Sequence, residues 1–177
     1  MIKINDMEFE CYLNSKILKK IVKHLAIKIK NDYKKKKPLF IVVLNGSFIF
    51  AADLLRMLET IPYEVKFVQY KSYEGTESTC QVKQIIGLNK EEIEGRDLII
   101  LEDIVDTGLT IKEILNILTP ESKSIEVVTL FYKPKALIHK VTPKYVGIEI
   151  PNIFILGYGL DYNGIGRNLK DVYQLKK

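Results

Sequence analysis

The sequence has too few cysteines for a disulfide scaffold, and it lacks the patterns of zinc centres and membrane spans. It has no tryptophan and only two cysteines, Cys11 and Cys80, which provide no disulfide framework. Its two histidines, His24 and His139, have no cysteine or carboxylate partner at the spacing of a zinc site. No apolar run approaches the roughly 20 residues of a membrane-spanning helix, so we expect no membrane partner.

Two patterns that would change the interpretation are also absent. No Gly-x-Gly-x-x-Gly follows an apolar run, which argues against a dinucleotide-binding protein. Residues 1–10 contain acidic side chains and no apolar core, so we expect no secretory signal there. With so few cysteines, a cytoplasmic location is the simplest expectation.

The composition indicates one globular domain. The chain has 177 residues, 47% of them hydrophobic and 28% charged, which suits a single domain over residues 1–177. The net charge is +5, and most of the excess is lysine. The run Lys34–Lys37 invites a nucleic-acid interpretation, but no aromatic residues interleave it and Pro38 follows directly. A solvated loop is the better interpretation, and we expect no nucleic-acid partner.

The order of the predicted elements is typical of an α/β protein. Residues 14–30 carry apolar side chains on one helical face, including that of Ile17, and lysines largely on the other. Apolar runs predict strands at residues 39–44, 63–70, 81–86, 98–101, 124–131, 145–148 and 153–156, and helices at residues 48–58 and 111–118. Strands that alternate with helices predict a largely parallel sheet with helices on both faces.

The most informative motif follows the apolar run at residues 98–101. Glu102 and Asp103 come first, then two apolar residues, then Asp-Thr-Gly-Leu-Thr at residues 106–110, where a helix is predicted to begin. Ligands bind at the carboxyl ends of parallel strands, and free amides at a helix N-terminus bind anions. These features predict a site for a polyol phosphate held with Mg²⁺. An acidic strand end before an ordinary helix cap is the plainer alternative.

The order of two acids, two apolar residues and Asp-Thr-Gly-x-Thr resembles the phosphoribosyl-pyrophosphate (PRPP) motif of the type I phosphoribosyltransferases. The segments at residues 44–54, 71–79 and 149–163, together with Lys133, narrow the resemblance to the hypoxanthine-guanine phosphoribosyltransferases, which then covers about residues 6–175. The resemblance implies an α/β fold in which helices flank a parallel-rich central sheet. It also implies a flexible hairpin lid at about residues 71–80 and a small hood made of N-terminal residues and about residues 150–177.

The activity that the resemblance implies is purine salvage. The enzyme would transfer the 5-phosphoribosyl group from PRPP to the 6-oxopurines hypoxanthine or guanine, with Mg²⁺ as cofactor and pyrophosphate as the second product. Relatives of this kind are commonly dimers or tetramers, so a homodimer or homotetramer is expected.

The resemblance also assigns roles at the PRPP motif. Asp106 would act as the general base toward purine N7, a role that needs hydrogen-bond reach rather than an extreme pKa. Glu102 and Asp103 would hold the ribose hydroxyls and a metal ion. The 5′-phosphate would be gripped by the amides and hydroxyls of Asp106, Thr107, Gly108, Leu109 and Thr110.

Two other segments would complete the PRPP site. Asn45, Gly46 and Arg167 would meet the pyrophosphate, and the resemblance implies a non-proline cis peptide bond that ends at Gly46. Ser72 and Tyr73 would belong to the lid that closes over the reaction centre and excludes water. From the sequence pattern itself, Ser47 is a candidate cap for the helix that follows the turn.

A third group of residues would bind the purine. Lys133 would donate a hydrogen bond to the purine O6 atom and so favour 6-oxopurines over 6-aminopurines. Phe154 would stack on the base, and the backbone of Ile155 would contact the purine edge. Asp161, beside them, would supply the carboxylate for a second metal ion.

Structural interpretations and two rival functions remain open from the sequence. Residues 45–47 alone are an ordinary turn, residues 71–79 a polar hairpin tip, Lys133 a surface lysine, and residues 154–155 core strand. A PRPP-binding regulator would need a nucleic-acid-binding part, for which about 38 residues before the first core strand are too few. A pyrimidine-using phosphoribosyltransferase is the second rival, and Lys133 together with residues 154–161 argues against it.

Overall fold

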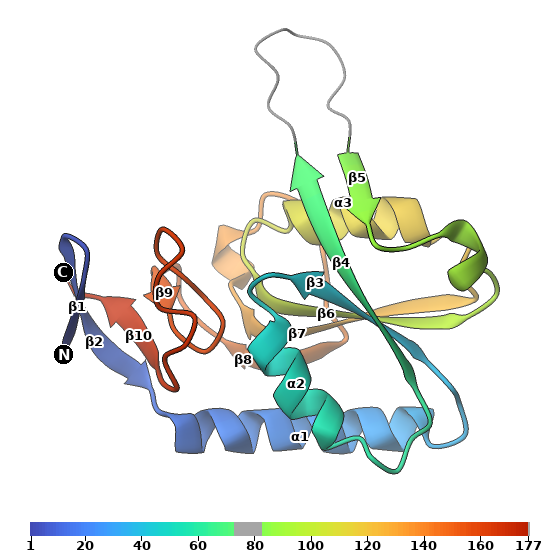
Figure 1. Ribbon diagram of the computed structural model, residues 1–177, viewed down its shortest axis with the longest axis horizontal. Coiled ribbons are helices and arrows are strands. Elements are labelled where there is room, and N and C mark those ends of the chain that lie inside the picture. Colours follow the sequence, from blue (N-terminus) through green and yellow to red (C-terminus); the bar gives the residue numbers. More distant parts are fainter. Residues whose placement is uncertain (73–82, 177) are drawn as a thin grey trace, which may run out of the picture.

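The computed structural model describes residues 1–72 and 83–176, which form two β-sheets and three α-helices (Figure 1). The segment predicted as a lid, residues 71–80, falls mostly outside the described residues. In chain order the strands and helices are β1 (Ile2–Ile4), β2 (Met7–Leu13), α1 (Ser15–Tyr33), β3 (Leu39–Leu44), α2 (Phe48–Arg56), β4 (Glu64–Ser72), β5 (Lys83–Ile86), β6 (Asp97–Val105), α3 (Leu109–Leu118), β7 (Ser124–Tyr132), β8 (Tyr145–Glu149), β9 (Ile155–Leu156) and β10 (Val172–Leu175). Short 3₁₀ turns lie at Lys90–Glu92 and Pro134–Ala136.

The larger sheet has the strand order β5-β4-β3-β6-β7-β8. Strands β4, β3, β6, β7 and β8 run parallel, and β5 pairs antiparallel with β4. Because β3 and β6 are central and buried on both faces, they read as continuous apolar runs in the sequence. The prediction of a parallel-rich sheet is therefore confirmed.

Alternate side chains of the central strands pack against helices on opposite faces. Phe40 and Val42 belong to the core that also contains the buried faces of α1 and α2. Leu39 and Ile41 belong to a second core together with α3. Figure 1 shows this arrangement, with α1 along one face of the sheet and α3 on the other. Helices on both faces were expected from the alternation of elements.

Helix α1 differs from its prediction near both of its ends. It continues to Tyr33, which is 2% exposed and so adds one more buried position to the apolar face. Ile17, expected on that face, is 41% exposed, because it lies in the first turn beside the Asn14 cap. The Asn14 side chain accepts a hydrogen bond from the Ile17 amide at 3.1 Å and satisfies that free donor.

The smaller sheet joins the two ends of the chain. Its strand order is β1-β2-β10-β9, and all its pairs are antiparallel. Figure 1 shows it at the left, beyond the N-terminal end of α1, with the N- and C-termini close together. Phe9 is fully buried in its core with Leu156. This sheet occupies the part of the chain that was expected to form a hood.

Strands β6 and β9 differ from their predicted bounds next to candidate site residues. Strand β6 runs through Glu102 and Asp103 to Val105, since its ladder with β7 continues as far as the pair Val105–Tyr132. Strand β9 covers only residues 155–156, because the amide of Ile153 bonds to the Pro151 carbonyl in a tight turn. Among the described residues, no helix is both long and apolar enough to cross a membrane.

Candidate active site

The two acids of the motif lie where β6 passes the end of β3. The Asp103 amide donates a hydrogen bond to Ser47 Oγ at 3.1 Å, and Asp103 Oδ1 accepts one from the Ile104 amide at 2.8 Å. A side chain at Gly46 would overlap the Asp103 carboxylate, so this position needs glycine. Ser47 occupies the N-cap position of α2 without a side-chain capping bond, because its hydroxyl is used by Asp103. The capping prediction for Ser47 was therefore wrong.

Burial controls the protonation of this carboxylate pair. Burial, and then the neighbouring Asp103 charge, raise the pKa of Glu102 well above its usual range. Burial likewise raises the pKa of Asp103, while hydrogen bonds from its surroundings oppose the shift. Within the described residues, the Glu102 Oε2 atom is buried and has no hydrogen-bond partner. A buried polar atom without a partner is costly, so the pair calls for a cation or a hydroxyl donor from a ligand.

The next segment forms a hollow at the N-terminus of α3. Residues 104–111 and Glu102 line a cavity of about 250 Å³. Gly108 has a φ of 82°, and a side chain there would strike the His139 carbonyl oxygen. The Thr107 carbonyl accepts bonds from the Ile138 and His139 amides at 3.0 and 2.9 Å. These hydrogen bonds fix the position of the loop. Its amides at the helix N-terminus are favourably placed to bind an anion.

Lys133 and Asp106 face each other at the edge of this hollow. Lys133 Nζ lies 2.6 Å from Asp106 Oδ2, and the Lys133 amide bonds to the Val105 carbonyl at 3.0 Å. The lysine side chain is only 7% exposed, whereas that of Asp106 is 42% exposed. Lys133 is therefore not a solvated surface lysine, which was the alternative that the sequence left open. A buried ammonium group is retained only when it is paired, and Asp106 pairs it.

The loop after β9 meets the turn after β3. Arg167 Nη2 lies 2.6 Å from Asp161 Oδ1, and Arg167 Nη1 donates to the Gly159 carbonyl at 2.7 Å. Gly159 has a φ of 106°, and a side chain there would overlap the Gly46 carbonyl oxygen. The positive charge of Arg167 also opposes the rise in the Asp103 pKa. Residues from two distant segments thus gather around the carboxylate pair.

An aromatic platform lies in the smaller sheet. Phe154 is 43% exposed and contacts Phe9 and Tyr162, with ring centroids 6.2 and 5.8 Å apart. A large aromatic ring that is supported on one side and exposed on the other can stack with a planar ligand. Ile155 is buried in β9, where its backbone pairs with β10 at Gln174.

Comparison with known proteins gives the family. A family model for the phosphoribosyl transferase domain matches residues 9–163. A hypoxanthine-guanine phosphoribosyltransferase of Streptococcus pyogenes is 39% identical over 97% of this chain and 95% of its own length. The hypoxanthine-guanine phosphoribosyltransferase of Staphylococcus aureus is 38% identical over 97% of this chain and 96% of its own length. The chain belongs to the hypoxanthine-guanine phosphoribosyltransferase family.

Solved structures of such phosphoribosyltransferases share the fold. The hypoxanthine phosphoribosyltransferase of Staphylococcus aureus superposes with a TM-score of 0.83 at 36% identity, covering 97% of this chain and 93% of that chain. A mutant enzyme from Trypanosoma cruzi, solved as a ternary substrates complex, gives a TM-score of 0.87 at 31% identity over 96% of each chain. The type I phosphoribosyltransferase fold expected from the sequence is confirmed.

Several residues lie differently from what the phosphoribosyltransferase resemblance implies. The cis peptide bond joins Leu44 to Asn45, one residue before the expected position, directly where β3 ends. The Asp161 carboxylate, expected to bind a metal ion, forms an ion pair with Arg167. Its Oδ2 atom accepts a hydrogen bond from the Gly164 amide at 2.7 Å. Among the described residues, no group of three or more acids, histidines or cysteines could hold a metal ion.

Two expectations cannot be placed, and one contact was not foreseen. The Ser72 side chain and Tyr73 lie outside the described part of the phosphoribosyltransferase. Tyr158, between the two glycines 157 and 159, was not predicted to have a role, although its hydroxyl donates to Asp53 Oδ2 at 2.6 Å. The local signal for it is a bulky residue in a Gly-Tyr-Gly turn, which has a φ of 53°.

Proposed function

We propose that this protein transfers the 5-phosphoribosyl group from PRPP to hypoxanthine or guanine, yielding the nucleotide and pyrophosphate. The observation that carries the proposal is the Lys133–Asp106 pair, 2.6 Å apart beside the phosphate hollow. A 6-oxopurine presents O6 and N7 on the same edge, so one partner can donate to O6 while the other accepts the proton at N7. An adenine amino group at the same place would face the lysine donor and leave it unpaired.

The chain's own residues account for the other groups of PRPP. The amides of residues 107–110 bind the 5′-phosphate at the N-terminus of α3. Glu102 and Asp103 accept hydrogen bonds from the ribose hydroxyls, which satisfies the orphaned Glu102 Oε2 atom. The Asn45–Gly46 turn and Arg167 stabilise the negative charge that develops on the departing pyrophosphate. Phe154 stacks on the purine and holds it against Lys133.

One Mg²⁺ ion fits the carboxylate pair, and a second would require Asp161 to release Arg167. Magnesium usually takes one or two protein carboxylates and completes its shell with substrate oxygens and water. The pair Glu102 and Asp103 meets that requirement, with a buried Glu102 oxygen that has no partner among the described residues and raised pKa values that a cation would reverse. Asp161 is the candidate for a second ion and would have to exchange its bond to Arg167. When bound, the metal would neutralise pyrophosphate charge.

The test is steady-state kinetics with PRPP and each of hypoxanthine, guanine, xanthine and adenine, with and without Mg²⁺. We expect nucleotide formation with hypoxanthine or guanine, little with adenine, and dependence on the metal. Uracil and orotate belong in the same screen, because activity with them alone would identify a pyrimidine-using enzyme. PRPP binding without turnover of any base would instead indicate a regulator.

The assembly and location of the protein are also part of the proposal. A homodimer or homotetramer is expected for this family, and one related structure concerns how the C-terminal region of the Trypanosoma cruzi enzyme affects its oligomeric state and activity. Light scattering after size-exclusion chromatography measures the mass directly. The cytoplasm is the proposed compartment, since Cys11 is a free, exposed thiol of the kind that suits a reducing environment.

A further inference from the structure

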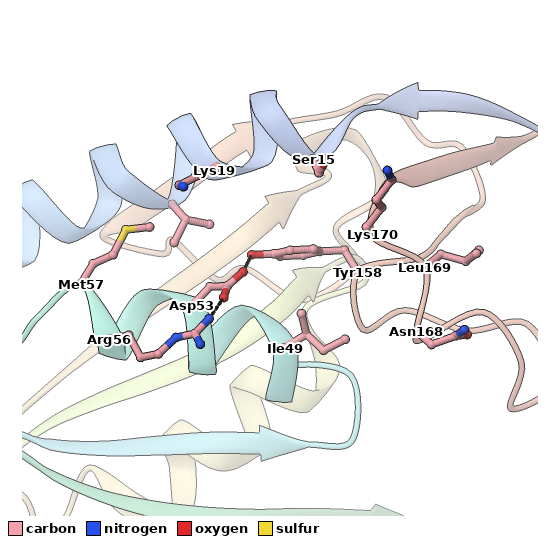
Figure 2. A pocket seen from close by; sticks show the side chains of 11 residues that line it. Ser15, Lys19, Ile49, Asp53, Arg56, Met57, Tyr158, Asn168, Leu169 and Lys170 are labelled. Carbon is pink, nitrogen blue, oxygen red and sulfur yellow. Dashed lines mark hydrogen bonds and ion pairs between the residues drawn. The ribbon is translucent and has the colours of Figure 1, made fainter.

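Helix α2 and the loop after β9 are joined by a partly buried hydrogen bond. The Tyr158 hydroxyl donates to Asp53 Oδ2 at 2.6 Å, while Asp53 Oδ1 pairs with Arg56 (Figure 2). The bond lies at the wall of a cavity of about 620 Å³ between α1, α2 and residues 168–170. Tyr158 is 7% exposed and comes from the loop, whereas Asp53 comes from the helix. Two segments about 105 positions apart in sequence are thus fixed to each other.

The backbone at Tyr158 shows that this position is held in place by its surroundings. Its φ is 53°, a value that a bulky side chain rarely adopts, and its neighbours Gly157 and Gly159 also have positive φ. The Tyr158 amide donates to the Leu169 carbonyl at 2.8 Å. A left-handed tyrosine persists only where neighbouring contacts over-determine it. Its side chain is held both by packing in the main core and by the hydrogen bond to Asp53.

The next residue carries this constraint into the active site. Gly159 lies so close to the Gly46 carbonyl that a side chain would overlap it, and its own carbonyl accepts from Arg167 Nη1 at 2.7 Å. The Gly159 amide in turn donates to the Arg167 carbonyl at 3.0 Å. Gly159, next to Tyr158 in the chain, thus contacts both Arg167 and the Gly46 turn.

Helix α2 carries the same constraint from the other side. It begins at Phe48, directly after the turn at residues 45–47, and Asp53 lies within its second turn. A rigid helix transmits the position of Asp53 to that turn. The hydrogen bond thus links the two segments that would hold the pyrophosphate of PRPP.

We propose that Tyr158 and Asp53 are positioning residues that align Arg167 with the Asn45–Gly46 turn around the pyrophosphate group. This inference rests on the proposed function, because it takes PRPP as the ligand. It assigns no chemical step to either residue. Their effect is to organise the pyrophosphate half of the site and to leave the 5′-phosphate half, at residues 106–110, unchanged.

The test variant is Tyr158→Phe, which keeps the ring and removes only the hydroxyl. We expect PRPP affinity, measured by calorimetry, to fall about tenfold, as for loss of a hydrogen bond to a charged acceptor. Affinity for inosine monophosphate, which has no pyrophosphate, should stay within about twofold. Asp53→Ala should match Tyr158→Phe, and the double variant should be no worse than either. Asp53→Asn keeps an acceptor oxygen for the Tyr158 hydroxyl and should retain most of the PRPP affinity of the unaltered protein.

The control is Tyr145→Phe. Tyr145 is also buried, and its hydroxyl donates to Asp32 Oδ2 at the same 2.6 Å, but it begins β8 at the opposite end of the parallel strands. It should lose similar thermal stability and retain PRPP affinity. If Tyr158→Phe behaves like Tyr145→Phe, or weakens both ligands equally, the positioning role is wrong. If the unaltered protein consumes no PRPP with any base, the proposed function fails instead.

Discussion

At the residue scale, the site depends on charges that the fold holds in close pairs. Lys133 is buried because Asp106 pairs with it, and the buried Glu102 Oε2 atom beside Asp103 has no partner within the described part of the chain. The first arrangement is satisfied without ligand, and the second is not. We therefore expect substitutions in the two pairs to have opposite effects on the stability of the free protein.

Asp106→Asn tests the general-base role. The asparagine retains an acceptor for Lys133 but cannot take a proton from purine N7. We expect kcat to fall by about 10²-fold or more, with PRPP affinity little changed. Single-turnover kinetics and PRPP calorimetry measure the two quantities separately. A kcat close to that of the unaltered enzyme would remove Asp106 from this role.

Lys133→Ala tests how the base is selected. Loss of the donor to O6 should reduce kcat/KM for hypoxanthine by about 1–3 kcal/mol, and discrimination against adenine should relax in parallel. Lys135→Ala is the matched control, since Lys135 is exposed in the following 3₁₀ turn. An unchanged ratio of hypoxanthine to adenine turnover would contradict the assignment.

Glu102→Gln tests the cost of the unsatisfied carboxylate. Burial and Asp103 raise the Glu102 pKa in the folded protein, so the stability that this group contributes is present below its ordinary pKa and is lost as the pH rises toward the folded value. We expect metal-free Glu102→Gln to be more stable than the unaltered protein above neutral pH. In assays with Mg²⁺, the variant should be less active. Urea unfolding across pH measures this, with the exposed Glu94→Gln as control. Equal pH profiles for all three proteins would show that Glu102 carries no such penalty.

At the scale of elements, the site is made by junctions rather than by any single helix or strand. The loop between β6 and α3 turns at Gly108, whose positive φ and contact with the His139 carbonyl fix its course. In the turn between β3 and α2, a side chain at Gly46 would overlap the Asp103 carboxylate. Each junction needs a glycine because another backbone or carboxylate occupies the space of a side chain.

Gly108→Ala tests the phosphate loop as an element. Gly95 offers a matched control, because its φ is also positive, 66°, but a side chain there would meet nothing within 4 Å. Gly95→Ala should cost only the backbone strain, about 1–2 kcal/mol in urea unfolding. Gly108→Ala should cost more and should also raise the KM for PRPP at least about tenfold, since the phosphate amides shift. Equal PRPP kinetics in the two variants would show that the loop does not bind the 5′-phosphate.

At the scale of the whole molecule, the sequence predicts what is local and misses what is distant. The runs at residues 39–44 and 98–101 predicted the central strands, because burial on both faces leaves an unbroken apolar signal, and the motif at residues 106–110 predicted the turn that leads into α3. The bond from Asp103 to Ser47 joins residues 56 apart, and that from Tyr158 to Asp53 joins residues 105 apart. No periodicity records such contacts, so Ser47 was given the wrong partner and Tyr158 none.

The smaller sheet depends most strongly on the whole molecule, because β10 pairs with both β2 and β9. The Leu175 amide also donates to the Phe154 carbonyl at 3.0 Å and so holds the aromatic platform. We expect a chain truncated after Asp171 to lose hypoxanthine binding more than about tenfold while it still binds PRPP, since the larger sheet keeps all its strands. Asp171 is retained because its carboxylate accepts from the Ser15 amide at the start of α1, at 2.7 Å.

Circular dichroism and calorimetry with each ligand would test this truncation. Val172→Ala is a milder companion, since Val172 is fully buried between the strands and the main core. It should weaken hypoxanthine binding in the same direction while β10 remains paired. If the truncated chain unfolds, the smaller sheet is part of the main folding unit and cannot be separated from PRPP binding. If it instead folds and binds hypoxanthine normally, the purine platform does not depend on the C-terminal strand, and Phe154 would have to be replaced as the proposed stacking residue.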